Sequence, residues 1–357
     1  MCGVIDQTTG VGAMASCQKI LNSEKILDNQ QKKTSAGTRP WLLTVFIMMM
    51  IMKLSVIQWG FLGQSSFNNQ IASQITKFLS KESASFSGEN HAAVPTNFTI
   101  EEEDFCRRHP DIDVITYVHS VISHVEKRMN TRRTWARVDT CGRGVKLGVV
   151  FAVGRSKTKE EEEIVRRESE LYRDIVQGDY DDDYHLLSYK GLSSLHWINK
   201  NCPSVPWTLH ADDDIVVDVF VMKGMTDTID SNLEDRFTCK CLVGPVKRHG
   251  KWAVPRQQYS QDQYEKYCKG TLWLLPTRKL QELLLASKKA TYLWVDDAYV
   301  TGVLAKEAGI GHRDLNQDFG EARYLEDQVG RNISWYHLPE EERLGLWQKI
   351  LEHNNCS

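Results

Sequence analysis

The segment Val205–Val217 reads Val-Pro-Trp-Thr-Leu-His-Ala-Asp-Asp-Asp-Ile-Val-Val, an apolar strand pattern that runs into three adjacent carboxylates. Like charges this close resist common ionisation, and buried carboxylates need partners or a metal. Ligands of open α/β sheets bind beyond the carboxyl ends of strands, so Asp212–Asp214 is where a divalent cation and a diphosphate would bind. The alternative is a solvent-exposed turn. The run Asp179–Asp183 fits that alternative better, because no apolar strand closes around it.

On the N-terminal side of this segment, strand patterns alternate with helix patterns. Runs rich in β-branched residues predict strands at 114–118 and 145–153, and helical spacing predicts helices at 125–135, 157–177 and 184–199. Buried parallel strands read as such continuous apolar runs. The alternation therefore predicts an α/β fold with a mostly parallel central sheet. Beyond the triplet we expect a helix at 298–308, closed by Gly309, and a terminal helix that begins at Pro339.

Composition bounds the class of protein. The chain has 357 residues, of which 41% are hydrophobic and 25% are charged, with a formal net charge of -3. This is the composition of a globular protein, and the lack of a basic field argues against a nucleic-acid partner. Polar segments without periodicity predict a disordered tail at 1–40 and an extended stem at 63–110. The compact domain is predicted to span 111–357.

An apolar tract covers residues 41–62 and is interrupted by Lys53. A bilayer core needs roughly 20 mostly apolar residues, which the tract supplies. Basic residues are concentrated before the tract, so residues 1–40 are expected in the cytosol and the rest on the far side, as behind a type II signal anchor. The alternative is a buried core helix.

Two further features agree with a secretory location. Glycosylation acceptor patterns begin at Asn97, Asn332 and Asn355, the last at the very terminus. Seven cysteines follow the apolar tract, which is compatible with disulfides in an oxidising compartment. Because seven is odd, at least one thiol is expected to be free or to pair between chains.

Other polar residues each allow two interpretations. Arg128 and Arg132 lie four residues apart on one helix face, suited either to a pyrophosphate or to solvent. Asp296 and Asp297 precede a helix, where carboxylates either cap it or act as a general base. His337, which precedes the terminal helix, is either a metal ligand or a structural residue.

Taken together, these segments resemble the inverting β-1,3-galactosyltransferase and β-1,3-N-acetylglucosaminyltransferase family (glycosyltransferase family 31). The resemblance covers residues 112 to 350 in collinear order. It rests on Arg128-x-x-x-Arg132-Arg133-Thr134-Trp135, Val150-Phe151-Ala152-Val153-Gly154-Arg155, Glu168-Ser169-x-x-Tyr172-x-Asp174-Ile175, Tyr184 with Lys190, the acidic triplet, Lys251-Trp252-Ala253-Val254-Pro255, Tyr267-Cys268-x-Gly270 and Asp296-Asp297-Ala298-Tyr299-Val300-Thr301-Gly302.

The resemblance implies a glycosyltransferase-A-type fold, a UDP-sugar donor, Mn²⁺ and a single displacement with inversion. Under this resemblance Asp297, with Asp296 beside it, becomes the catalytic base. Asp214 becomes the strongest metal ligand, joined by Asp212 and His337. The donor site would comprise Arg128, Arg132, Trp135, Lys190, Asp212, Asp213 and Gly270. A disulfide between Cys202 and Cys268 is a further hypothesis.

The expected activity is transfer of a hexose, galactose first or else an N-acetylhexosamine, to the 3-hydroxyl of an acceptor glycan in the Golgi lumen. Departures from the family pattern at Thr131, Asp296, Ala298 and Lys269–Thr271 leave the donor sugar open. The alternative is a catalytically silent relative that binds glycans or assists a partner transferase. A metal-dependent hydrolase would need a further cluster of ligands, which the sequence does not show. Expected partners are the UDP-sugar, the acceptor glycan and the membrane, with a homodimer or partner transferase as a further possibility.

Overall fold

The structure is a computed structural model that describes residues 94–136, 141–315, 320–322 and 328–356. These residues belong to one compact unit, Glu89–Ser357. The predicted tail at 1–40, the predicted signal anchor at 41–62 and most of the predicted stem lie outside the described residues. No helix in the described ranges combines the length and the apolar character that crossing a bilayer requires.

An eight-stranded sheet forms the centre of this unit, in the order β1-β4-β3-β2-β5-β8-β7-β9. The strands β4, β3, β2 and β5 pair in parallel with one another, whereas β1 is antiparallel to β4, and β8 is antiparallel to both β5 and β7. This confirms the α/β fold with a mostly parallel central sheet. The strands are β1 (Phe98–Ile100), β2 (Val114–His119), β3 (Leu147–Arg155), β4 (Ile175–Asp181), β5 (Trp207–Asp212), β7 (Arg236–Leu242), β8 (Tyr267–Pro276) and β9 (Gly311–Asp314).

A second sheet, β10-β11-β6, follows the acidic triplet and consists of β6 (Val216–Val217), β10 (Gly320–Ala322) and β11 (Asn332–Trp335). The helices are α4 (Phe105–Arg108), α5 (Val125–Arg133), α6 (Lys159–Tyr172), the 3₁₀ turn Tyr184–Leu186, α7 (Leu187–Asn201), α8 (Val219–Thr228), the 3₁₀ turn Thr277–Lys279, α9 (Leu280–Ala286), α10 (Asp296–Ala298), the π-helical segment Tyr299–Leu304, α11 (Ala305–Glu307) and α12 (Glu340–His353). The predicted helix at 298–308 is thus helical but widens to a π-helix directly after α10.

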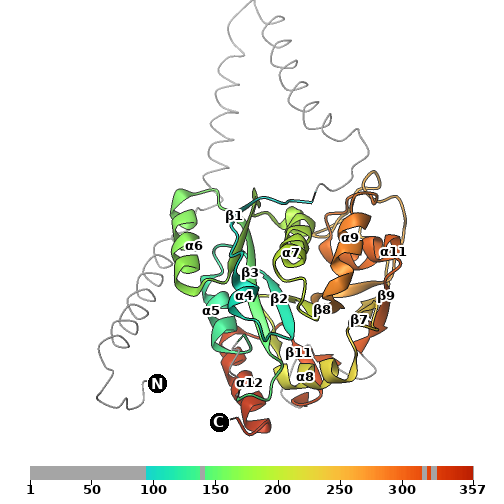
Figure 1. Ribbon diagram of the computed structural model, residues 1–357. Coiled ribbons are helices and arrows are strands. Elements are labelled where there is room, and N and C mark those ends of the chain that lie inside the picture. The colour runs from blue at the N-terminus through green and yellow to red at the C-terminus, as the bar shows by residue number, and fades with distance from the viewer. Residues whose placement is uncertain (1–93, 137–140, 316–319, 323–327, 357) are drawn as a thin grey trace, which may run out of the picture. The chain divides into compact units, whose positions relative to one another are not determined.

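Helices cover both faces of the central sheet, as Figure 1 shows for α6 on one side and α7 and α9 on the other. Alternate residues of β2 contribute to the two cores, because successive side chains of a strand point to opposite faces. Ile115 and Tyr117 pack with residues of α7 and α9, whereas Val114 and Val118 pack with residues of α6, α8 and α12. This alternation decides which strand residues can reach a site on the α7 side.

Two predicted boundaries are wrong. The helix predicted at 157–177 ends at Tyr172, where Arg173 adopts a left-handed conformation (φ 55°), and the chain then forms β4. Asp179 and Asp181 therefore lie at the end of a strand rather than in a turn. The compact domain also begins before residue 111, because β1 pairs with β4.

The cysteines pair differently from the hypothesis. Cys202 bonds to Cys106 on α4, and Cys268 bonds to Cys239 on the neighbouring strand, so a Cys202–Cys268 bond is wrong. Both observed pairs bring their Cα atoms to 5.5 Å, within the range that a disulfide can span. Cys241 is the free thiol among the described residues.

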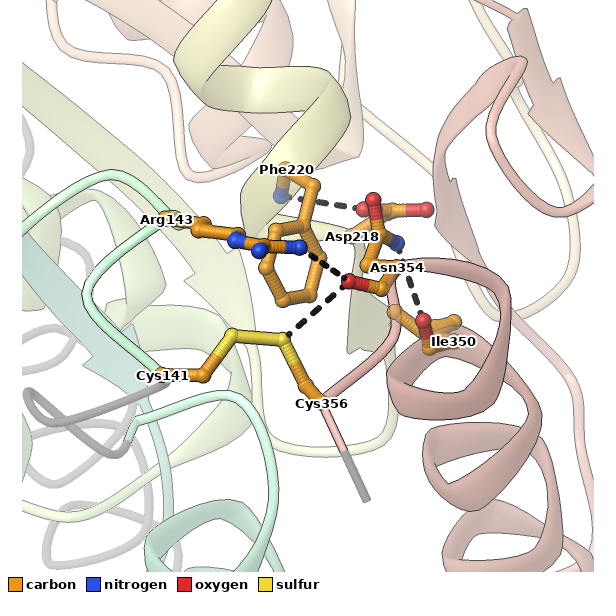
Figure 2. The surroundings of a disulfide bond; sticks show 7 residues. All are labelled: Cys141, Arg143, Asp218, Phe220, Ile350, Asn354 and Cys356. Atoms are coloured by element: carbon orange, nitrogen blue, oxygen red, sulfur yellow. Dashed lines mark hydrogen bonds between the residues drawn. A yellow bond between two sulfur atoms is a disulfide. The ribbon is translucent and has the colours of Figure 1, made fainter.

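A third disulfide joins Cys141 to Cys356 near the end of the chain (Figure 2). Beside it, the guanidinium of Arg143 donates a hydrogen bond to the carbonyl of Asn354 (3.1 Å). The bond fastens the segment after α12 to the loop after α5. Since α12 carries Arg343, which reaches the backbone carbonyl of Asp213, this end of the chain supports the acidic triplet.

Candidate active site

A cavity of about 510 Å³ opens where β2 and β5 end, on the face of the sheet that carries α7. Carboxylates from two separate segments meet there: Asp212 from the end of β5, and Asp296 with Asp297 from α10. Gly270 of β8 lines the cavity opposite α10. Such a concave site, with apolar walls and a few converging polar groups, is the usual form of a small-molecule site.

Asp297 is half-buried at the cavity wall and is fixed by backbone contacts. Its Oδ1 accepts a hydrogen bond from the N–H of Ala298 (2.8 Å). A Cβ on Gly270 would lie 3.3 Å from the Cβ of Asp297, which is tighter than most such contacts, so glycine suits this position. Burial raises the pKa of Asp297 to about 6, although backbone N–H groups of Ala298 and Gly270 oppose the rise. A carboxyl with this pKa accepts a proton at neutral pH more readily than an ordinary aspartate.

Asp296 lies deeper than Asp297. Burial and the neighbouring charge of Asp297 raise the pKa of Asp296 well above its ordinary value, which favours the protonated form. A Cβ added to Gly191, inside α7, would lie 2.5 Å from Oδ1 of Asp296, so the glycine leaves room for this carboxyl. The two neighbouring carboxyls thus have different pKa values, and Asp297 is the better base.

The three carboxylates of the triplet lie in three different environments. Asp213 is buried and bonded to Ser120 Oγ (2.8 Å), His124 Nδ1 (2.7 Å) and Lys127 Nζ (3.1 Å). Burial alone would raise its pKa, but these partners lower it. Asp213 is therefore held as an anion by internal partners, and the donor contact predicted for it stays a prediction.

Asp212 and Asp214 lack such compensation. The pKa of Asp212 is raised well above its ordinary value by desolvation and by the charges of the nearby carboxylates, Asp214 first among them. Among the ion pairs of the described residues, Asp212 has only His210 at 3.8 Å, and Asp214 is paired with no Lys or Arg. The charged form of Asp212 is therefore disfavoured unless a positive group binds beside it.

His337 is exposed and follows β11 with a left-handed backbone (φ 61°). In the antiparallel pairing of β11 with β6, Ser334 lies opposite Val217 and Trp335 opposite Val216. Asp214 lies in the turn before β6, and His337 lies in the bend after β11, so the two residues flank the same end of this strand pair.

Among the described residues, a different set of side chains forms a close group of potential metal ligands. Ligand atoms of His119, His210 and Asp296 lie within 4.8 Å of one another, whereas Asp212, Asp214 and His337 form no such group. Burial lowers the pKa of His210 to about 4 and that of His119 well below its ordinary value, so both rings are neutral. His210 Nε2 donates to the carbonyl of Gly270 (2.8 Å), which orients the backbone of β8 toward Asp297.

Four residues predicted to touch the donor lie behind the cavity instead. Arg128 and Trp135 have no exposed surface, and Lys190 is 2% exposed. Arg128 pairs with Glu168 (2.6 Å) and donates to the carbonyls of Val121 and Ile122. Arg132 pairs with Glu168 and Asp174, both at 2.8 Å.

The remaining two hold the backbone of the site. Trp135 Nε1 donates to the carbonyl of Ile215 (3.1 Å), directly after the triplet. Lys190 donates to the carbonyl of Ser120 (2.5 Å) and to Asp182 (2.7 Å). In the structure, Arg128, Trp135 and Lys190 bond to the loops that follow β2 and β5, and the direct donor contact of these residues and of Arg132 stays a prediction.

His119 and His210 are cavity residues that the sequence did not predict. His119 ends β2 and lies opposite Asp212 in the register, and His210 precedes Asp212 by two residues on the same face. The alternation of side chains along β2 and β5 indicates which residues share a face of the sheet. It could not place His119 beside Asp212, because that requires the register of β2 against β5.

A substitution of Arg128 tests the supporting role. Arg128→Met leaves Glu168 buried with Arg132 as its only partner, and breaking a buried pair typically costs about 3–5 kcal/mol. We expect a fall of this order in the free energy of unfolding, measured by urea denaturation. Arg166→Met breaks exposed pairs with Glu163 and Glu170, which solvent screens, and should lower the free energy of unfolding far less than Arg128→Met does. Equal losses from the two variants would contradict the assignment.

The fold and the cavity define an α/β protein that binds its ligands at the carboxyl ends of parallel strands. A family model described as Galactosyltransferase matches residues 126–316. The chain therefore belongs to the galactosyltransferase family and is a glycosyltransferase.

Individual relatives agree. The chain is 27% identical to mouse beta-1,3-galactosyltransferase 5 over 260 residues, which is 68% of this chain and 82% of the relative. It is 26% identical to the human protein of that name over 262 residues, 71% of this chain and 83% of the relative. Mouse beta-1,3-galactosyltransferase 1 is 24% identical over 268 residues, 72% of this chain and 80% of the relative.

A solved structure of the galactosyltransferase LgtC with donor and acceptor sugar analogs covers 66% of this chain and 95% of its own at 9% identity, with a TM-score of 0.36.

Proposed function

We propose that this glycosyltransferase transfers galactose from UDP-galactose to the 3-hydroxyl of an acceptor glycan, with inversion, on a glycosyltransferase-A-type fold. The names of its relatives support the donor sugar and the linkage. The observation that carries the chemistry is the position of Asp297: a fixed carboxylate with a pKa of about 6 at the wall of an acidic cavity.

In this mechanism Asp297 takes the proton of the acceptor 3-hydroxyl. The acceptor oxygen attacks the anomeric carbon of galactose while the bond from that carbon to the UDP oxygen breaks on the opposite face. Attack opposite the leaving group inverts the anomeric centre in a single step. Burial and the charge of Asp297 raise the pKa of Asp296 well above its ordinary value, so the protonated form of Asp296 is favoured and Asp297 is the carboxylate that takes the proton.

The donor set at the triplet fits a divalent cation such as Mn²⁺. Asp212 and Asp214 supply carboxylate oxygens without a Lys or Arg partner among the described residues, which hard cations prefer, and His337 follows β11, the strand that pairs with β6 directly after the triplet. We propose that these three residues hold the ion. When bound, it would neutralise the charge that develops on the UDP leaving group.

We further propose a type II Golgi protein with a lumenal catalytic domain. The three disulfides support an oxidising compartment. Of the sequons, Asn97 is exposed and open to modification, whereas Asn332 is 3% exposed within β11. A homodimer or a partner transferase stays a prediction. The silent relative is the weaker alternative, because Asp297 retains the pKa and setting of a base.

A donor panel tests the proposed function. The full-length chain is incubated with single UDP-sugars, Mn²⁺ and a set of acceptor glycans, and UDP release is measured. We expect acceptor-dependent release with UDP-galactose. Release with UDP-N-acetylglucosamine alone would overturn the donor assignment. If none of the UDP-sugars gives release of UDP, the result would favour the silent relative.

The pH dependence should follow Asp297. Only its ionised form accepts the acceptor proton, and its pKa is raised to about 6, so activity is retained above that value and lost as the pH falls through it. We expect kcat/KM to fall about tenfold for each pH unit below the pKa, since this parameter reports the free enzyme. Initial rates between pH 4.5 and 8 measure it. A profile that stays flat down to pH 4.5 would exclude Asp297 as the base.

A further inference from the structure

Two large aromatic side chains stand exposed at the rim of the cavity. Trp252 is 52% exposed and Tyr184 is 41% exposed, and both line the cavity that contains Asp297. They come from separate segments: Tyr184 starts the 3₁₀ turn before α7, and Trp252 lies between β7 and β8. Exposed apolar surface of this kind beside a pocket usually marks a binding surface.

The pair is fixed in orientation. Trp252 Nε1 donates a hydrogen bond to the hydroxyl of Tyr184 (3.0 Å), which joins the two segments. The ring of Tyr184 also lies 5.9 Å from that of Trp294, a cavity residue whose Nε1 donates to the carbonyl of Ala253 (3.2 Å). Rigid aromatic groups lose little entropy when a ligand binds them.

The surrounding segment is also held. Arg248 donates to the carbonyls of Val254 and Tyr259, both at 2.9 Å, and so closes the loop that carries Trp252. The orientations of Trp252 and Tyr184 are therefore preformed. The ammonium of Lys251 lies over one face of each ring, 4.5 Å from the Tyr184 centroid and 5.6 Å from the Trp252 centroid, so a ligand would stack on the opposite face.

We infer that Trp252 and Tyr184 form a stacking platform for a pyranose ring of the acceptor glycan. Aromatic faces carry partial negative charge, and the axial C–H bonds of a pyranose present a complementary positive, apolar face. Under the proposed function on which this inference rests, the acceptor must lie against Asp297, because that residue takes its proton. The uncompensated carboxylates Asp212 and Asp214 mark the other end of the site, where the diphosphate belongs. The platform therefore receives the acceptor rather than the uracil.

The test compares three variants of the full-length chain. Trp252→Ala removes the platform, Trp252→Phe keeps an aromatic face without the hydrogen bond, and Leu285→Ala removes an apolar side chain of similar exposure (50%) on α9. Truncation of an aromatic anchor should raise the acceptor KM about tenfold or more. We expect this rise for Trp252→Ala, partial recovery in Trp252→Phe and no change in Leu285→Ala.

The donor KM and the acceptor-free hydrolysis of UDP-galactose should not change. An unchanged acceptor KM, or an equal rise in the donor KM, would overturn the inference; thermal melting shows whether each variant is folded.

A binding readout separates this inference from the proposed function. Saturation-transfer NMR is recorded with methyl β-galactoside and methyl β-N-acetylglucosaminide, without any donor. The inference predicts transfer of saturation from the protein to the ring C–H protons of one glycoside. This transfer should be lost in Trp252→Ala and kept in Leu285→Ala. Such a result supports the platform even if no UDP-sugar is turned over. If wild type shows no transfer to either glycoside, the platform assignment is wrong, whatever the donor assay shows.

Discussion

Replacing Asp297 by asparagine is expected to lower kcat by about 10²–10⁴-fold, the usual contribution of a positioned general base. Asparagine has nearly the same shape and still accepts the hydrogen bond from the Ala298 N–H, but it cannot take the acceptor proton. The KM for the donor should change little, because Asp297 is held by α10 and β8 rather than by the triplet. Steady-state rates with saturating donor and acceptor measure the effect.

Asp296→Asn is the matched control. Because burial and the charge of Asp297 favour the protonated form of Asp296, a neutral amide resembles that form in charge and size. Its kcat should fall far less than that of Asp297→Asn. The reverse order, with the larger loss at Asp296, would make the deeper carboxyl the base and contradict the role of Asp297.

Replacing Asp214 by alanine is expected to lower kcat/KM by about 10²–10³-fold, as the loss of a group that stabilises leaving-group charge typically does. The substitution removes one of the two uncompensated carboxylates, so the concentration of Mn²⁺ that gives half-maximal activity should also rise. Rates measured across a Mn²⁺ titration separate this effect from a general loss of activity.

Asp213→Asn is the control within the triplet. Asp213 is bound by Ser120, His124 and Lys127, so its substitution should lower the free energy of unfolding and leave the Mn²⁺ requirement close to that of wild type. If Asp214→Ala kept the wild-type Mn²⁺ requirement while Asp213→Asn raised it, the ligand assignment would be wrong.

The α/β fold and the acidic residues could be predicted because their signals are local. The apolar strand followed by Asp212–Asp214 reads the same in the sequence and in the structure. The carboxylates Asp296 and Asp297, predicted to precede a helix, are its first two residues in α10. The pKa difference between Asp296 and Asp297 could not be predicted, because it depends on depth in the cavity and on the approach of Gly191 and Gly270.

Other features depend on partners far apart in the sequence. A basic helix face looks alike whether it meets solvent or, as for Arg128, a buried glutamate 40 residues away. Disulfide partners follow from which strands are neighbours, which is why Cys268 pairs across the sheet with Cys239. His119 and His210 became visible only once the register of β2 against β5 placed both on the cavity face.

The most direct test of the central claim is the anomeric configuration of the product made from UDP-galactose, whose galactose is α-linked. The full-length chain, Mn²⁺ and an accepted glycan are incubated with this donor, and the new linkage is identified by the coupling of its anomeric proton in ¹H NMR. A single displacement aided by Asp297 predicts a β-linked galactose on a 3-hydroxyl. An α-linked product would contradict it, because retention requires a different mechanism.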